Sequence, residues 1–384
     1  MHFLWLWVGL GCTNGPKEAP SRVAEQALSE GVSHSTFTVG TVVPLSGEME
    51  VIGRAVVEIL EARASQGEAV GGRHVEIVAV DGTGGNLAAA QRLVDGQDVF
   101  ALVAPLISGE ELEFARWAQR EGIPVVGPFA VHPAVERPPA REVFYVYPGT
   151  VQQVRSLVHD AVRRSMSAAL VTSEHEAFHA HRLAMDNQAA RYEGDWRVRM
   201  HDQERSGCAE LATQGVHRVI LDGEDAQIRS WLEAAGQEGC TPEVWLMGEA
   251  LERVYKPGPI DWNGRLFAST ASRPSDWTQE GISLYQETLK LAGKDPGPLP
   301  IQLGALASYR LFEEGLKKMD EPPSREGLVR ALEALHGFQT GLTRPLSYGP
   351  MRRVGAMGAW ITEREARLGY AMAAEDAQRW VEAK

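Results

Sequence analysis

Five consecutive residues carry a pattern that binds catalytic zinc in one class of proteases. They read H-E-x-x-H and are His175, Glu176, Ala177, Phe178 and His179. On a helix the two histidines share a face and can bind zinc, and the glutamate then serves as general base. Here the motif follows a predicted strand at 168–172 and opens a helix, and neither His181 nor Glu193 is well placed as third ligand. We therefore expect no enzyme, metal or other cofactor, although His175 should face a ligand bound at this edge of the sheet.

An apolar run near the start of the chain ends at Gly11 and Cys12. The run is too short to span a bilayer, which needs about 20 residues. A short apolar run ending in small residues is typical of a secretory signal, and Gly11-Cys12 resembles a bacterial lipobox. We predict a signal at residues 1–12 with lipid attached to Cys12; the alternative is a chance cysteine in an irregular terminus. Residues 13–35 contain glycine, proline and serine among charges, and they are predicted to form a flexible tether.

The other two cysteines, Cys208 and Cys240, lie 32 residues apart. Cys208 stands near the start of a predicted helix at 206–214, and Cys240 follows the end of another at 224–236. In a parallel sheet these positions fall on opposite edges, beyond the roughly 7 Å between Cα atoms that a disulfide tolerates. We therefore expect both thiols to be free.

The composition excludes several classes of protein. The chain has 384 residues, of which 44% are hydrophobic and 23% charged, values that fit neither a disordered chain nor a multi-span membrane protein. Its net charge is -13, from 38 basic and 51 acidic residues. A protein that binds nucleic acid non-specifically needs a basic face, so we expect no nucleic-acid partner.

Strand-like and helical patterns alternate along most of the chain, which favours βαβ units and parallel sheets. The first series of strand-like segments covers 37–43, 75–80, 100–104 and 123–126. A second series covers 143–147, 168–172, 196–200, 219–221 and 244–247. Long helical patterns follow at 276–292, 302–318 and 325–336, and then short strands near 344–348, 357–362 and 367–371. Two such sheets facing each other would form a cleft, with ligands bound at the carboxyl ends of the strands.

Several segments of the first series resemble one known family. They read VGTVVPLSG (39–47), GGRHVEI (71–77), VD (80–81), AAAQRLV (88–94), VAPLISG (103–109) and EGIPVVGP (121–128). In this order and spacing they resemble the type I periplasmic binding proteins of the leucine/isoleucine/valine class, the substrate-binding components of ABC importers. The resemblance extends from about residue 37 to 371.

The resemblance implies an α/β fold with two Rossmann-like lobes, joined by a hinge of three crossovers and closing on a ligand like a Venus flytrap. Lobe I would comprise residues 36–148 and 270–340. Lobe II would comprise residues 149–269 and 341–372, and residues 373–384 would form a C-terminal tail.

The resemblance also implies a ligand site. Ser108 matches a serine that grips the carboxylate of the ligand, and Phe129, Ala130 and Val131 match a loop that shares this task. Ser108 also fits a capping box with Glu111, and both roles can coexist. Val131 has no hydroxyl and Phe129 is bulky, so this half of the site departs from the pattern.

In lobe II, the resemblance implies an acidic residue that pairs with the ammonium group of the ligand. The candidates are Glu224 and Glu249, each at the carboxyl end of a predicted strand. Each could instead be a solvated loop carboxylate or a helix cap.

We therefore expect a lipid-anchored protein of the cell envelope, facing the periplasm or the extracellular side. It would capture an amino acid or similar small ligand and pass it to an ABC permease in the inner membrane. The alternative is a regulatory lipoprotein that resembles penicillin-binding-protein activators and acts on a cell-wall synthase, with or without a ligand.

Overall fold

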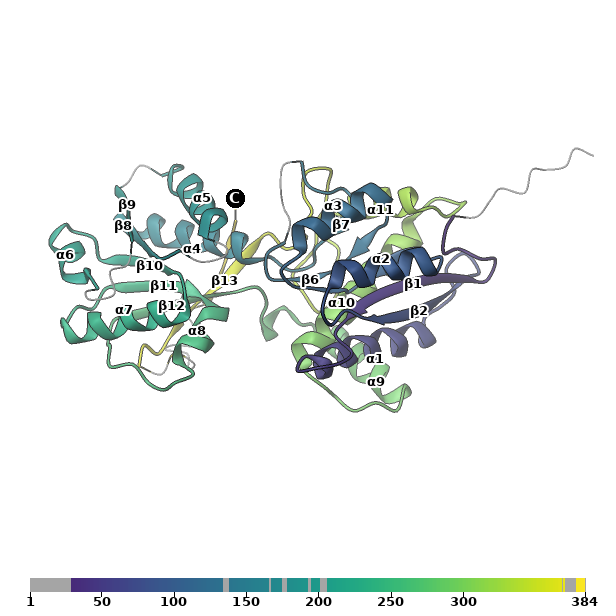
Figure 1. Ribbon diagram of the computed structural model, residues 1–384, viewed down its shortest axis with the longest axis horizontal. Helices are drawn as coiled ribbons and strands as arrows, with labels where there is room; N and C mark the ends of the chain where they lie inside the picture. Colours follow the sequence, from purple (N-terminus) through teal and green to yellow (C-terminus); the bar gives the residue numbers. More distant parts are fainter. Residues whose placement is uncertain are drawn as a thin grey trace, which may run out of the picture.

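The computed structural model describes residues 29–133, 138–165, 167–174, 178–192, 195–200, 206–367, 369 and 378–383. Two lobes meet at a narrow waist (Figure 1). Lobe I contains a five-stranded sheet and lobe II a seven-stranded sheet. Helices pack on these sheets, and most strands run parallel to their neighbours. The predicted α/β fold with two lobes built on parallel sheets is therefore confirmed.

The lobe I sheet is parallel throughout, in the order β2-β1-β3-β5-β7. Its strands are β1 (Thr36–Val43), β2 (His74–Asp81), β3 (Ala101–Val103), β5 (Val125–Val126) and β7 (Val143–Phe144). A small parallel sheet of β4 (Leu106–Ile107) and β6 (Phe129–Ala130) extends it beyond the ends of β3 and β5. Because the strand order reverses at β1, the crevice between the carboxyl ends of β1 and β3 is a favoured place for a ligand.

Six α-helices surround this sheet, and three of them come from late in the chain. They are α1 (Glu50–Gln66), α2 (Asn86–Gly96), α3 (Glu111–Glu121), α9 (Gln279–Leu291), α10 (Leu299–Lys318) and α11 (Arg325–Glu333), and a short 3-10 turn, η1 (Pro274–Asp276), precedes α9. Hydroxyls define two helix starts: Thr278 accepts from the Gly281 N–H, and Ser324 from the Gly327 N–H, each at 3.0 Å.

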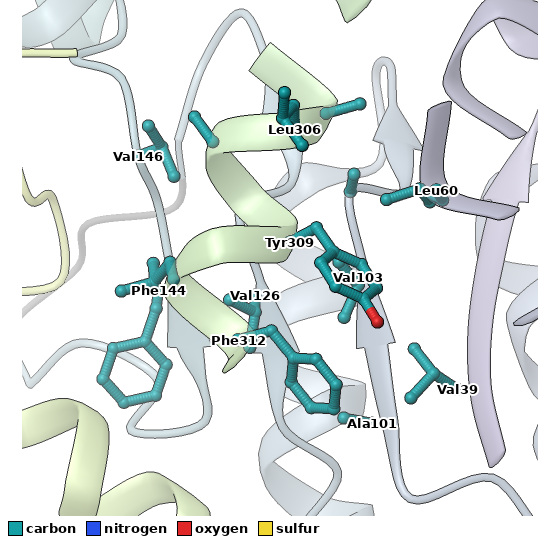
Figure 2. Close-up of a cluster of buried hydrophobic side chains, with 14 of the residues drawn as sticks. Val39, Leu60, Ala101, Val103, Val126, Phe144, Val146, Leu306, Tyr309 and Phe312 are labelled. Carbon is teal, nitrogen blue, oxygen red and sulfur yellow. The ribbon is translucent and has the colours of Figure 1, made fainter. Parts of the chain in front are cut away.

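Helix α10 forms the centre of the lobe I core. Leu306, Tyr309 and Phe312 are at most 1% exposed. Figure 2 shows their side chains among those of Val39 and Val103 on the neighbouring strands. The apolar face that the sequence predicts for this helix is thus buried against the sheet, which ties a late segment of the chain to the first strands.

The lobe II sheet has the order β14-β13-β12-β11-β10-β8-β9. Its strands are β8 (Ser167–Thr172), β9 (Asp195–Met200), β10 (Arg218–Asp222), β11 (Glu243–Met247), β12 (Arg265–Thr270), β13 (Gly358–Arg364) and β14 (Gln378–Glu382). The strands from β8 to β12 are parallel, whereas β13 and β14 are antiparallel to their neighbours. The sequence does not predict β12, which continues the parallel series beyond β11.

Helices cover both faces of the lobe II sheet. They are α4 (Thr150–Ser165), α5 (Phe178–Ala189), α6 (Cys208–Thr213), α7 (Asp225–Gln237) and α8 (Gly248–Tyr255). On one face Trp231 and Trp262 are buried with residues of α6, α7 and α8. On the other, Trp245 stacks on Phe267 at 4.6 Å between ring centroids, beneath α4 and α5. The sheet is therefore buried on both sides, as parallel sheets usually are.

The chain passes between the lobes three times in the part that the structure describes. The first passage joins β7 to α4, the second joins β12 to α9, and the third leads into β13. Just before the third passage, Val354 bridges to Tyr145 in parallel register, so two of the connecting segments lie side by side. Figure 1 shows these segments crossing the waist.

The third passage lies later in the chain than the resemblance implies. Leu342, Leu346 and Tyr348 are buried in the lobe I core, so residues up to about 356 stay with lobe I. The expectation that lobe II resumes at residue 341 is therefore wrong. Residues 338 and 346 form an isolated antiparallel bridge, which accounts for the strand-like pattern in this region.

The two ends of the folded part also differ from the predicted boundaries. Near the C-terminus, β14 pairs with β13, and Arg379 forms an ion pair with Asp160 of α4 where a tail is predicted. Near the N-terminus, Glu30 pairs with Arg325 at 2.5 Å, and the Gly31 carbonyl accepts from the Thr38 N–H. Residues 29–35 therefore contact lobe I. Both segments are too short to show a clear hydrophobic period.

The expectation that the two later cysteines remain free is wrong. Cys208 and Cys240 form a disulfide with 6.1 Å between their Cα atoms. Trp231 Nε1 donates to the Ser206 carbonyl, and the Ser206 hydroxyl donates to Glu238 at 2.7 Å. The segment leading into α6 thus lies against the end of α7. The prediction assumed a crossover helix starting at the far edge of the sheet, but α6 has only six residues and begins beside α7.

Candidate functional site

A solvent-exposed set of hydrogen bonds shapes the turn after β1 at the carboxyl edge of lobe I. One oxygen of Asp81 accepts from the N–H groups of Leu45 and Thr83 at 2.9 Å each. The other oxygen accepts from the Ser46 hydroxyl at 2.8 Å. These hydrogen bonds hold the pKa of Asp81 well below its usual range, and the two backbone N–H groups have the largest effect. The carboxylate therefore stays ionised and fixes the loop beside the switch point of the sheet.

Ser108 lies at the same edge, exposed and just beyond β4. The Asn86 side-chain amide, in the orientation that satisfies its hydrogen bonds, donates to the Leu106 carbonyl at 2.9 Å. Its oxygen accepts from the Ser108 N–H at 3.2 Å. The predicted capping box with Glu111 is wrong, because the N-cap of α3 is Glu110 and no side chain caps this helix. Glu110 instead accepts from the Leu87 N–H at the start of α2. The Ser108 hydroxyl is thus not used as a helix cap.

The predicted loop after β5 is divided between the core and the surface. The Phe129 ring packs over Gly304 of α10, where a Cβ atom would collide with it. Ala130 packs against the core beneath α3, whereas Val131 is 55% exposed. Phe129 therefore turns toward α10 rather than into solvent, and Val131 presents an apolar side chain next to the first passage between the lobes.

A pair of histidines, not predicted as a site, links the lobes beside Val131. His132 follows β6 of lobe I, and its Nδ1 lies 2.7 Å from the Thr150 hydroxyl at the start of α4. Its ring lies 5.9 Å from that of His181 on α5. His181 Nδ1 lies 3.0 Å from Asp222 at the end of β10, and both side chains are buried. Sequence reasoning considered His181 only as a metal ligand, and no local pattern signals its partner 41 residues away.

In lobe II, Glu224 is exposed and immediately precedes α7. Its N–H donates to the Ser173 hydroxyl at 3.3 Å, which joins the loops after β8 and β10. Glu224 therefore lies at the carboxyl edge of the sheet, as the sequence predicts.

Glu249 lies in the first turn of α8 and is held by a chain of buried polar groups. Gln153 of α4 donates to Glu249 at 2.8 Å and accepts from the Ser269 hydroxyl of β12 at 2.9 Å. Gln153 is 1% exposed, whereas Glu249 is exposed. The carboxylate is thus oriented from beneath while remaining accessible to a ligand. The sequence could not predict the role of Gln153, because α4 and α8 are far apart in the chain.

Glu249 lines a cavity of about 670 Å³ that both lobes help to form. Lobe II supplies most of the wall, including Glu252, Tyr255, Thr270 and Arg364, and lobe I supplies Pro300 at the start of α10. Burial lowers the pKa of Arg364, with the Glu252 carboxylate acting in the opposite direction. The volume is in the usual range for small-molecule sites. Figure 1 shows α8 and α10 in the two lobes, on either side of the waist.

The remaining predicted residues, Cys12 and His175, lie outside the part of the chain that the structure describes, as do Glu176 and Ala177. Phe178 begins α5, and His179 is exposed in its first turn. Within the described ranges, no group of three His, Cys, Asp or Glu side chains is arranged to hold a metal ion.

The chain, with its two lobes and the cavity that both help to form, matches a known family. A family model described as periplasmic binding protein matches residues 36–366. The chain belongs to the periplasmic binding protein family. This finding confirms the resemblance that the segments between residues 39 and 128 carry. The family is one of ligand-binding transport proteins rather than enzymes.

Solved structures of periplasmic binding proteins share the fold at low sequence identity. A possible leucine/isoleucine/valine-binding protein from Rhodopirellula baltica is 16% identical, with a TM-score of 0.62 over 94% of this chain and 99% of that one. A branched-chain amino acid ABC transporter protein from Thermus thermophilus, with bound valine, is also 16% identical, with a TM-score of 0.62 over 92% and 96%.

A fatty acid ABC transporter substrate-binding protein from Thermomonospora curvata is 17% identical, with a TM-score of 0.62 over 93% of this chain and 94% of that one. No curated protein matches the chain in sequence. At these identities the structures establish the fold, and they include proteins named for chemically different ligands.

Proposed function

We propose that this periplasmic binding protein is the substrate-binding component of an ABC importer and captures an amino acid or a similar small ligand between its lobes. The lobes close on the ligand by bending at the three passages, and the closed form delivers the ligand to a permease in the inner membrane. The protein performs no chemistry on the ligand.

The position of Glu249 carries this proposal. Its carboxylate is accessible, lines the cavity that includes Pro300 of lobe I, and is held by Gln153 from below. An ammonium group fits an oriented carboxylate, and Ser108 at the edge of lobe I offers a hydroxyl to the carboxylate of the same ligand. Glu224, Ala130 and His175 would complete the rim when the lobes close, with Val131 as an apolar contact.

We further propose that lipid on Cys12 anchors the protein at the cell envelope, on its periplasmic or extracellular side. No helix within the described ranges is long and apolar enough to cross a membrane. The anchor is tested by metabolic labelling with a fatty acid in cells that express the wild type or Cys12→Ala. Label in both proteins would contradict lipid attachment at this residue.

Thermal unfolding of residues 29–384 in the presence of amino acids, small amides, short peptides and fatty acids tests the transport function. A ligand at 100 times its dissociation constant stabilises the folded state by about 2.7 kcal/mol. For a chain of this size, this should raise the melting temperature by a few degrees. We expect a stabilising amino acid, whose effect falls in Glu249→Gln and in Ser108→Ala.

Glu287→Gln is the matched control, because Glu287 is an exposed glutamate on α9, away from the cavity. It should respond to the ligand as the wild type does. A ligand whose effect survives both Glu249→Gln and Ser108→Ala would place the site elsewhere. Stabilisation by fatty acids alone would keep the transport function and overturn the amino-acid ligand.

A regulatory role without a small ligand is the second candidate, and the edge of lobe I favours it. The Phe129 ring is packed inward, away from a ligand at this edge, and Val131 offers one exposed apolar side chain to a partner. In that case the panel would give no stabilisation, and a cell-wall synthase would bind the wild type more tightly than Val131→Asp.

A further inference from the structure

A second cavity, of about 530 Å³, lies at the hinge rather than between the carboxyl edges of the sheets. The segment leading into the third passage contributes Arg344 and Arg352, α4 contributes Gln152 and Arg155, and β14 contributes Trp380 and Glu382. Its wall contains neither Ser108, Phe129, Glu224 nor Glu249. It is therefore distinct from the cavity beside α8, and its occupant does not depend on the proposed function.

The wall of this cavity is basic although the chain as a whole is acidic. Four arginines line it, Arg155, Arg344, Arg352 and Arg353, against one lining carboxylate among the described residues, that of Glu382. Arg353 forms an ion pair with Glu333, which also pairs with Arg141. The excess of positive charge stands out in a protein with a net charge of -13.

Arg344 and Arg352 make their direct contacts with neutral groups, and the Asp276 carboxylate interacts with Arg344 electrostatically without forming an ion pair. The Arg344 guanidinium lies 4.5 Å from the ring centroid of Trp380 and 5.5 Å from that of Trp360. Arg352 donates to the Gly355 carbonyl at 2.7 Å and to the Val354 carbonyl at 3.4 Å. Neither guanidinium forms an ion pair with a carboxylate in the part of the chain that the structure describes. Both are thus positioned cations whose charge is not neutralised by direct contact.

The start of α4 adds to the positive potential. Gln152 lies in the first turn of this helix, and the described first turn contains no acidic residue. The amino end of a helix carries partial positive charge, which favours an anion. Gln152 is 2% exposed, and its Oε1 accepts from the Gly149 N–H, so its amide group is held within the wall.

The rest of the wall is apolar, which limits the kind of anion that fits. Pro345, Met351, Met357 and the Trp380 ring line the cavity together with the arginines. Its volume exceeds that of an inorganic ion and lies in the range of small-molecule sites. We propose that the hinge cavity binds a small organic anion, in which a carboxylate or phosphate group meets Arg344 and Arg352 and an apolar group lies against Trp380.

The bound anion would join groups from both lobes. Arg352 belongs to the segment that packs with lobe I, whereas Gln152 and Trp380 belong to α4 and β14 of lobe II. An anion that contacts all three residues stabilises the conformation in which they converge. The size of this effect equals the difference between its binding free energy for this conformation and for the others.

Isothermal titration calorimetry of the full chain tests the site, in a buffer without phosphate or carboxylate. The probes are phenyl phosphate, benzoate and inorganic phosphate. We expect one phenyl phosphate per chain, bound more tightly than inorganic phosphate because of the apolar wall. Arg344→Gln and Arg352→Gln should each weaken this binding about tenfold, the effect of losing one charge-assisted hydrogen bond.

Arg92→Gln is the matched control, because Arg92 is exposed on α2 and far from the hinge in the fold. Arg352→Lys, which keeps the charge, should bind with intermediate affinity, and Glu249→Gln should bind phenyl phosphate as the wild type does. Arg352 is exposed, so its variants should fold; unchanged melting temperatures without the probe would verify this.

Three results would overturn the proposal. The first is the absence of binding by any of the probes at millimolar concentration. The second is binding that neither arginine substitution weakens, which would place the anion elsewhere. The third is binding of an acidic peptide such as hexaglutamate in place of the small anions, which would make the basic wall a protein-binding surface.

Discussion

The two lobes share a strand-helix plan but place different groups at the edges where a ligand would bind. In lobe I the loop after β5 is apolar, with the Phe129 ring against Gly304 and Val131 exposed. In lobe II the corresponding loops carry Glu224 and Glu249, the latter oriented by Gln153. The same arrangement of strands and helices can thus carry very different side chains at its carboxyl edge, because the loops at the strand ends supply the groups that contact a ligand.

The lobes also differ in how their ends are secured. Lobe I gains α9, α10 and α11 from late in the chain, and its core is closed by apolar packing. Lobe II gains the antiparallel strands β13 and β14 and a disulfide between α6 and the end of α7. Both lobes are thus closed by apolar packing, and within the described residues lobe II adds a covalent link.

Removal of the disulfide should have the largest effect on this difference. A closed loop of 32 residues between Cys208 and Cys240 predicts a loss of about 3 to 4 kcal/mol in the free energy of unfolding. The Cys208→Ser/Cys240→Ser variant, followed by tryptophan fluorescence in urea, should unfold lobe II at lower denaturant than the wild type. Reduced wild type should behave like the variant. A single unchanged transition in both would contradict the assignment of this role to the disulfide.

Gly304→Ala should have the next largest effect, and it acts on lobe I. The added Cβ atom would collide with the Phe129 ring and press on Tyr147, and overpacking of this kind costs about 1 to 3 kcal/mol. Thermal unfolding measures the loss. Gly96→Ala is the matched control in α2, where nothing lies within 4 Å and alanine should be neutral or slightly stabilising. Equal stability of the two variants would show that Phe129 moves freely.

Gln153→Leu should have a smaller effect, confined to lobe II. The Ser269 hydroxyl would lose its acceptor and Glu249 its donor, and a buried polar group left without a partner costs about 1 to 3 kcal/mol. Since Glu249 is exposed to water, we expect a value near the lower limit in urea unfolding. Gln119→Leu on the exposed side of α3 controls for the loss of an amide. A loss no greater than in this control would mean that Glu249 does not need Gln153.

The smallest effect should come from Asp81→Asn, and it should depend on pH. The pKa of Asp81 is lowered in the folded state, so its contribution to stability is present above the unfolded pKa of about 4. This contribution is lost as the pH falls through the lower folded pKa. The difference in melting temperature between wild type and Asp81→Asn should therefore shrink below pH 4. Asp95→Asn on α2 gives the baseline, and a difference that does not change with pH would contradict the prediction.

The sequence predicted most of the regular elements because their apolar periods are clear. The helix predicted at 302–318 corresponds to α10, and the strand predicted at 75–80 corresponds to β2. The two-residue strands β4 and β6 and the turn η1 are too short to predict in this way, and three longer elements were also missed. Helix α8 has eight residues and follows β11 directly, β12 follows a loop without a period of its own, and β14 has five residues near the C-terminus.

For the site, the sequence placed Glu224 and Glu249 after the right strands, because the ends of strands follow from the apolar pattern. The family resemblance placed Ser108 at the edge of lobe I. The sequence could not show that α3 begins beyond Ser108, because Ser108 and Glu111 have the spacing of a capping box. In the structure the N-cap residue is Glu110. Nor could it predict Gln153 as the partner of Glu249, because a hydrogen bond across 96 residues leaves no local pattern.

By itself the sequence determined the alternation of strands and helices, because periodicity and turn residues are local properties of the chain. Its segments between residues 39 and 128 carried the resemblance to the family. Only the tertiary structure decided which distant residues meet. It joined Cys208 to Cys240, placed Arg344 beside two tryptophans, and brought Pro300 and Glu249 to the wall of one cavity. These contacts depend on how helices pack on the sheets and where the chain passes between the lobes, and both are set by the burial of apolar surface over the whole molecule.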